Sequence, residues 1–137
     1  MKHNWTLPSP GDIVWCLFPQ IPEMEPGPKP RPVLVVQVEG REDGAIVSVV
    51  YGTSQNVKRL KTGEMVITRA MHPAAYALAG LAYDTKFDFK LIQDLPWSDR
   101  YFKTPPRNPF GNSPKMGTLH ATVVHAAAVA YRAALAR

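Results

Sequence analysis

Short apolar runs rich in valine and isoleucine recur along the first two thirds of the chain, and each ends at proline, glycine or a polar turn. Runs of this length and composition are typical of buried β-strands. A glycine-bounded turn at residues 40–44 separates two of these runs, which are therefore expected to pair antiparallel. The predicted strands are residues 12–18, 32–38, 45–51, 63–69 and 80–87, with a weaker continuation at 89–95.

The spacing of apolar positions changes near the C-terminus. From Leu119 onwards apolar residues return every three or four positions, which predicts a helix over residues 119–136 with Thr118 as its N-cap. A short helical turn is expected at residues 73–78, because Pro73 suits the first position of a helix.

Fourteen prolines mark two stiff connecting segments, at residues 8–32 and 96–114. The loop at residues 19–30 is too long for a tight hairpin. The pattern therefore predicts a mainly β (α+β) fold in a single domain over residues 1–137. This domain is expected to be a small antiparallel barrel followed by a C-terminal helix, with an irregular proline-rich segment at 96–118.

Composition narrows the possible chemistry. The net charge of +5 and the pI of about 9.5 favour a polyanionic partner, although many proteins of this charge bind no nucleic acid. The single cysteine, Cys16, lies in an apolar run and the four histidines are scattered, so no disulfide framework, metal site or cofactor is predicted. No stretch approaches the roughly 18 apolar residues of a membrane span, so we expect a cytoplasmic protein without membrane contact.

Arg31 stands between Pro30 and Pro32, where a predicted strand begins. Both prolines restrict the backbone, which lowers the entropy lost when the side chain binds a ligand. A guanidinium presents five N–H donors in a fork that suits phosphate oxygens. Lys29 adds charge just before it. Taken alone, Arg31 could equally be a surface residue of a proline-rich loop.

Small hydroxyl residues follow the third predicted strand. Thr53 and Ser54 come directly after Gly52, where hydroxyl and backbone donors can point at an anion, but such residues also dominate ordinary turns. The Gln55 amide can read a base edge or remain solvated. Lys58 and Arg59 concentrate charge beside this cluster.

Charged residues alternate along the fifth predicted strand, at Asp84, Lys86 and Asp88. Such an alternation is typical of a solvent-exposed strand face. Its alternative interpretation is functional: a carboxylate such as Asp84 is then available as a base or orienter near Arg31.

These segments together resemble the PemK/MazF family of toxin endoribonucleases. The match consists of the Gly-Asp-Ile-Val-Trp opening at residues 11–15, the Arg-Pro-Val-Leu-Val-Val run at 31–36 and Thr-Ser-Gln at 53–55, with a weaker echo at 80–84. Some family members carry a basic residue at the position of Ala82, and Lys86 lies on the same predicted strand face.

The resemblance implies an SH3-like barrel of the CcdB/MazF type, usually a homodimer, and metal-independent cleavage of single-stranded RNA. Arg31 and Thr53 fall on the family's catalytic positions. Ser54, Gln55, Lys29, Lys58 and Arg59 would bind RNA or its phosphates, and Asp84 or Lys86 would act as base or orienter. A cognate antitoxin would bind near the loop at 19–30.

Two other functions fit the same resemblance. The first is a non-catalytic SH3-like barrel that binds nucleic acid or a protein partner. The second is a toxin of the same fold that acts on a protein target such as gyrase. An RNA cleavage assay separates both from the endoribonuclease.

Overall fold

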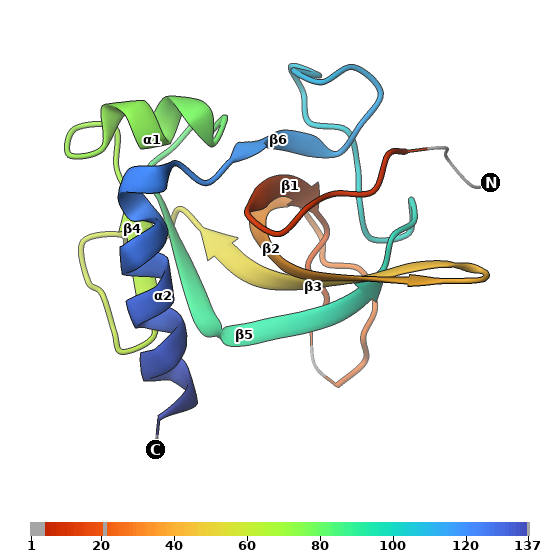
Figure 1. Cartoon of the computed structure of the whole chain (residues 1–137), viewed down its shortest axis with the longest axis horizontal. Coiled ribbons are helices and arrows are strands. Elements are labelled where there is room, and N and C mark those ends of the chain that lie inside the picture. The colour runs from red at the N-terminus through yellow and green to blue at the C-terminus, as the bar shows by residue number, and fades with distance from the viewer. Residues whose placement is uncertain (1–4, 21, 137) are drawn as a thin grey trace.

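The computed structural model describes residues 5–20 and 22–136, and within them strands dominate (Figure 1). This confirms the mainly β fold with a C-terminal helix. The strands are β1 (Asp12–Cys16), β2 (Arg31–Arg41), β3 (Gly44–Thr53), β4 (Glu64–Ile67), β5 (Thr85–Pro96) and β6 (Lys115–Thr118). The helices are α1 (Pro73–Leu78) and α2 (Ala121–Leu135).

The six strands form one antiparallel sheet in the order β4-β5-β3-β2-β1-β6. The sheet is not closed into a complete barrel, because β4 and β6 remain as its edges. Helix α1 follows β4 and its C-terminal end packs on β6: a Cβ built on Gly117 would lie 2.1 Å from the carbonyl oxygen of Leu78. The end of α1 therefore packs directly against one of the two edge strands.

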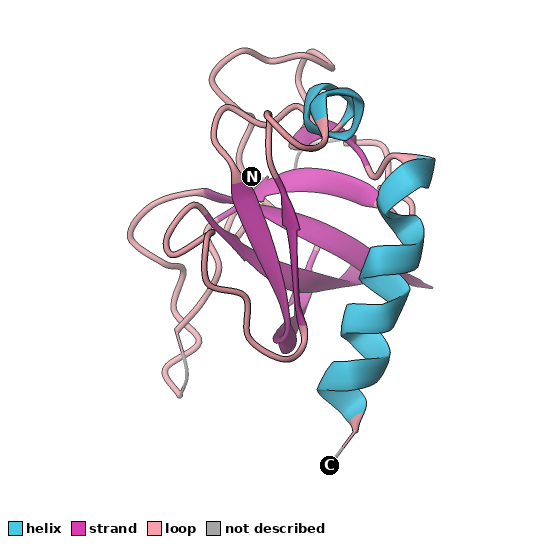
Figure 2. Ribbon diagram, turned by 90° about the vertical axis from the view of Figure 1, so that its left-hand side faces the viewer, coloured by secondary structure: helices cyan, strands magenta, loops and turns pink. Residues whose placement is uncertain are grey.

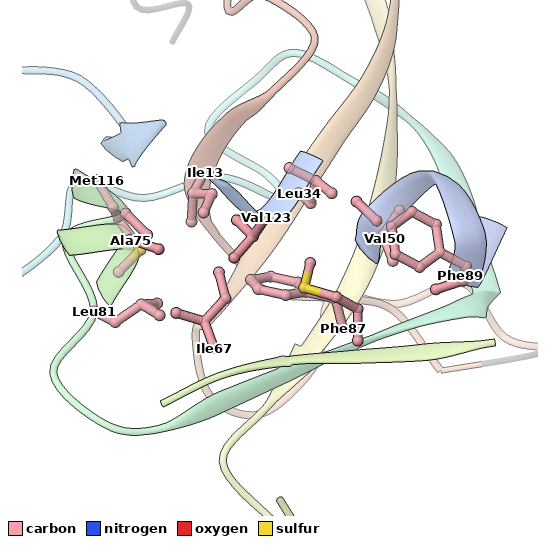
Figure 3. Packing of buried hydrophobic residues seen from close by; sticks show 14 residues of the cluster. Ile13, Leu34, Val50, Ile67, Ala75, Leu81, Phe87, Phe89, Met116 and Val123 are labelled. Atoms are coloured by element: carbon pink, nitrogen blue, oxygen red, sulfur yellow. The ribbon is translucent and has the colours of Figure 1, made fainter. Parts of the chain in front are cut away.

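Apolar residues alternate between the two faces of the sheet and build two cores. The helix-side cluster lies under α1 and α2 and includes Ile13, Leu34, Val50, Phe87 and Val123 (Figure 3). Helix α2 runs along this side of the sheet (Figure 2). The loop-side cluster lies on the opposite face. It comprises Val14, Cys16, Val33, Val35, Val47, Val49, Leu95, Tyr101 and Phe102.

Several predicted boundaries differ from the structure. Strand β5 begins at Thr85 rather than at residue 80, because Gly80 adopts a left-handed conformation (φ +70°) that ends α1. The strand then runs to Pro96, with an irregularity in its pairing with β3 between Asp88 and Ile92. Helix α2 begins after His120, whose side chain accepts a hydrogen bond from the Thr122 amide, so His120 rather than Thr118 is the N-cap.

The segment predicted to be irregular at 96–118 contains ordered pairing. It includes β6, and Phe102 forms an isolated bridge to Cys16. The Leu17 amide also donates to the Tyr101 carbonyl at 2.7 Å. This segment therefore flanks the end of β1 that lies next to Arg31.

Gly52 marks a close approach between β2 and β3, and its replacement with alanine is expected to lower the free energy of unfolding by about 1–3 kcal/mol. A Cβ at Gly52 would lie 2.1 Å from the carbonyl oxygen of Pro32, a backbone atom that cannot swing away. Urea denaturation measures the effect. Gly40→Ala on β2 is the matched control, because no atom lies within 4 Å of its Cβ position. Equal losses for both variants would contradict this packing.

Candidate active site

Arg31 and Thr53 lie at adjoining strand ends. Strand β2 begins at Arg31, β3 ends at Thr53, and Val33 pairs with Tyr51. Continuing this antiparallel register by two residues on each strand would set Arg31 opposite Thr53. The close contact between Gly52 and Pro32 shows that the two strands still touch at this point. Topology thus brings together two residues that are 22 positions apart in the chain.

The Arg31 side chain is held by an aromatic ring. Its guanidinium carbon lies over the Tyr51 ring, 5.4 Å from the centroid. Within residues 5–20 and 22–136, no carboxylate lies within 4.0 Å of this guanidinium. Arg31 is half-buried, and its positive charge and N–H donors remain available for an anion.

Thr53 is buried, and its hydroxyl oxygen accepts a hydrogen bond from the Gln55 amide at 3.1 Å. This turn fixes the hydroxyl while leaving its hydrogen free to donate. Ser54 and Gln55 are exposed just beyond it. A buried, oriented hydroxyl followed by exposed polar side chains is suited to contact a phosphate and the group attached to it.

Lys86 pairs with Thr53 across β3 and β5, but its ammonium is not turned to solvent. Its side chain is 8% exposed and Nζ donates to Glu64 Oε1 at 3.0 Å and to the Arg59 carbonyl at 3.1 Å. Glu64 also accepts from the Lys61 amide at 2.7 Å. The pair therefore anchors the loop that carries the exposed Lys58 and Arg59.

The remaining predicted residues lie around Arg31, Thr53 and Lys86 rather than between them. Asp84 lies just before β5, and its Oδ1 accepts from the Arg69 amide at 2.8 Å, so it fixes the turn after β4. Lys29 is exposed two residues before β2. The site thus joins Arg31, Thr53 and Lys86 on neighbouring strands, with Asp84 set apart.

A family model described as "PemK-like, MazF-like toxin of type II toxin-antitoxin system" matches residues 9–104, which is more than half of the chain. The chain belongs to this PemK/MazF-like toxin family. A search of curated proteins found no significant match. The matched span includes β1 to β5 and every predicted site residue, whereas β6 and α2 lie beyond it.

Two residues that contact this candidate site were not predicted from the sequence. Tyr51 was predicted only as a strand residue, although strand alternation places it on the same face as Thr53 two positions later. Glu64 opens a short strand, where a carboxylate is ordinarily exposed, and only the fold shows that it meets Lys86. The signal for Tyr51 was present in the sequence, whereas that for Glu64 was not.

The loop before Arg31 is tied to the segment that flanks β1. The Tyr101 hydroxyl donates to the Met24 carbonyl at 2.7 Å, and Arg100 pairs with Glu25 at 3.1 Å. Met24 has a left-handed backbone (φ 58°), which is uncommon for a side chain of this size. These contacts hold the loop against the loop-side cluster, next to the start of β2.

Two further properties concern the described residues as a whole. No helix there is long and apolar enough to cross a membrane. Between residues 5 and 136, with residue 21 left out, no three histidine, cysteine or acidic side chains form a group that could hold a metal ion.

Glu64 gives the protein an acid-sensitive contact. Burial of its carboxyl group opposes ionisation, but hydrogen bonds from the Lys61 amide and the Lys86 ammonium, with the charges of both lysines, hold the pKa of Glu64 below its ordinary value of 4.5. Because the pKa is lowered in the folded state, this stabilisation is complete above pH 4.5 and is lost as the pH falls through the folded-state value.

Glu64→Gln is therefore expected to reduce the free energy of unfolding most at neutral pH, with the deficit shrinking below pH 4.5. Urea denaturation of both proteins between about pH 3 and pH 7 measures this difference. Glu39→Gln, at a carboxylate whose side chain is 56% exposed, is the control for removing a charge at the surface, and its loss at neutral pH should be smaller. A deficit for Glu64→Gln that stays constant across this range would contradict the assignment.

Proposed function

We propose that this chain is an endoribonuclease that cleaves single-stranded RNA without a metal ion, and that it is the toxin of a type II toxin-antitoxin pair. One observation carries the proposal. The Arg31 guanidinium has no carboxylate partner among the described residues, and it lies at the start of β2, which adjoins the end of β3 that carries the Thr53 hydroxyl. Family membership supports the same function.

The reaction is an internal transesterification. The ribose 2′-oxygen attacks the adjacent phosphorus, a P–O2′ bond forms and the P–O5′ bond breaks, leaving a 2′,3′-cyclic phosphate and a free 5′-hydroxyl. The 2′ proton leaves to water and the departing 5′-oxygen takes a proton from water. Arg31 stays charged throughout, because a guanidinium does not lose its proton in a protein.

Charge accumulates on the two non-bridging phosphate oxygens during this step. Donors already aimed at that charge lower the barrier, because they need no reorganisation as the charge develops. Arg31 supplies a forked, charged donor set and Thr53 supplies its hydroxyl hydrogen. Lys86 acts as an orienter, since its buried ammonium holds the adjoining loop, and Asp84 supports the neighbouring turn.

Exposed polar and basic side chains around this point form the RNA-binding rim. Unpaired RNA presents base edges that a duplex hides, and Gln55 is placed to read one. Basic side chains bind the phosphates on either side of the cleaved bond. The rim consists of Lys29, Ser54, Gln55, Lys58 and Arg59.

The family also implies two protein partners in the cytoplasm. The antitoxin would bind near the loop at 19–30, beside Arg31.

For a homodimer, α2 offers an apolar seam of Val124, Ala128, Tyr131 and Leu135, of which Leu135 is 71% exposed. This seam borders an apolar groove against Pro10 and Leu34. Analytical ultracentrifugation with Leu135→Glu tests this dimer face, because a buried charge would weaken self-association.

The activity is tested with purified protein, excess EDTA and a mixed pool of single-stranded RNA. Wild type should cleave RNA, leave a DNA strand of the same sequence intact, and cleave duplex RNA poorly. Thr53→Val should slow the reaction, because valine keeps the shape of threonine but lacks the hydroxyl, which also accepts from the Gln55 amide. If wild type leaves the RNA intact, the endoribonuclease is excluded and a binding module or a protein-directed toxin takes its place.

A further inference from the structure

We propose that Tyr51 is a positioning residue of the active site: its ring holds the Arg31 guanidinium in the orientation that binds the scissile phosphate. The proposal rests on the endoribonuclease function above. It assigns a role to an aromatic side chain that touches neither the phosphate nor the reacting atoms.

The sheet places Tyr51 directly in line with the two proposed catalytic residues. It lies on β3 two positions before Thr53, so both side chains leave the same face of the strand. It pairs with Val33, which stands two positions after Arg31 on β2. The backbone therefore fixes the ring beneath the guanidinium without any further loop.

The Tyr51 ring is itself braced. Phe18, just after β1, meets it edge to face, with ring centroids 5.0 Å apart and an interplanar angle of 62°. Edge-to-face pairs of this kind stabilise ring orientation. Phe18 and Arg31 thus both contact the Tyr51 ring, Phe18 from the segment just after β1 and Arg31 from the start of β2.

A ring contact suits this arginine better than a carboxylate would. A salt bridge would occupy the N–H donors of the guanidinium and lower its effective charge. A cation held over an aromatic face is attracted through the ring quadrupole, and its in-plane donors stay free. Among the described residues no carboxylate reaches Arg31, so the Tyr51 ring is the contact that the structure provides for orientation.

The test is a series of substitutions at Tyr51 in which aromatic character and side-chain volume change separately. Tyr51→Phe removes only the hydroxyl, Tyr51→Trp strengthens the cation–π contact, and Tyr51→Leu removes the ring. We expect the kcat of RNA cleavage to fall about three- to tenfold for leucine, with KM changed less, and to be retained by phenylalanine and tryptophan. Tyr76→Leu, at another half-buried tyrosine, removes a ring outside the site and should leave kcat unchanged.

A second readout needs no catalysis. In NMR spectra of the free protein, the side-chain protons of Arg31 should be shifted upfield by the ring current, and Tyr51→Leu should return them to ordinary values. Tyr51→Phe should preserve the shift. This measurement distinguishes the stacking from the reaction, because it gives an answer whether or not RNA is cut.

Each outcome decides a different part of the proposal. Equal kcat for Tyr51→Leu and wild type, or a tryptophan variant as slow as leucine, would overturn the positioning role. Arg31 protons at ordinary shifts in wild type would overturn the stacking. A wild type that shows the upfield shift but cleaves no RNA would overturn the proposed function, and the role of Tyr51 with it, while leaving the ring contact itself established.

Discussion

Arg31→Ala is expected to reduce the rate of RNA cleavage by about 10²–10³-fold while the protein remains folded. Removal of one preorganised donor from an oxyanion-binding site typically costs this much, and here the lost group also carries a positive charge at the strand end that adjoins Thr53. The measurement is a single-turnover rate in EDTA, with circular dichroism to confirm the fold. Arg31 is half-buried and has no carboxylate partner in the described chain, so its truncation leaves no buried charge unpaired.

Arg41→Ala is the matched control for this variant. Arg41 lies at the opposite end of the same strand, ten positions from Arg31 and on the order of 30 Å away. It pairs with Glu39 on the exposed β2–β3 hairpin, which projects from the body of the sheet (Figure 1). The two variants lose the same charge, so equal rates for both would show that net charge, rather than the Arg31 site, governs cleavage.

Lys86→Met is expected to produce the largest loss of stability, about 3–5 kcal/mol, because it leaves the Glu64 carboxylate buried without its cation. The side chains of this pair are 8% and 6% exposed, and Lys86 also satisfies the Arg59 carbonyl. For a domain of this size the midpoint of thermal unfolding should fall by about 10–15 °C. Calorimetry and urea denaturation measure the change.

The double variant Lys86→Met with Glu64→Leu distinguishes two causes of this loss: an unpaired Glu64 carboxylate and the altered packing of the Lys86 side chain. Replacing both charges with apolar side chains is often neutral for stability, so most of the loss should be recovered. RNA affinity should stay reduced, because the loop with Lys58 and Arg59 has lost its anchor. A double variant less stable than Lys86→Met alone would contradict the proposed pairing.

Sequence patterns predicted the parts of the fold that depend on local chemistry. Valine-rich runs located β2 and β3, the glycine turn at 40–44 specified their pairing, and the three- to four-residue period located α2. The boundary near Gly80 was misplaced, because one left-handed glycine interrupts an otherwise apolar run. Barrel closure could not be judged, since it depends on how α1 packs against β6.

The candidate site was also predictable only where it depends on local chemistry. The parts that depend on pairing between distant strands were not predicted. The prolines beside Arg31 and the glycine before Thr53 indicated two strand ends, and the sheet register joins them. The charged alternation on β5 favoured a solvent face for Lys86, yet β4 brings Glu64 across and buries the ammonium. Long-range pairing decides such contacts, and no local pattern encodes it.

The chemistry of the product ends tests the central claim most directly. Arg31 and Thr53 are proposed to stabilise attack by the substrate's own 2′-oxygen, so fragments analysed by mass spectrometry should end in a 2′,3′-cyclic phosphate and begin with a 5′-hydroxyl. A single 2′-deoxy substitution at the cleaved position should abolish cutting there. Fragments that carry a 5′-phosphate and a 3′-hydroxyl, or unchanged cleavage of the 2′-deoxy substrate, would contradict it.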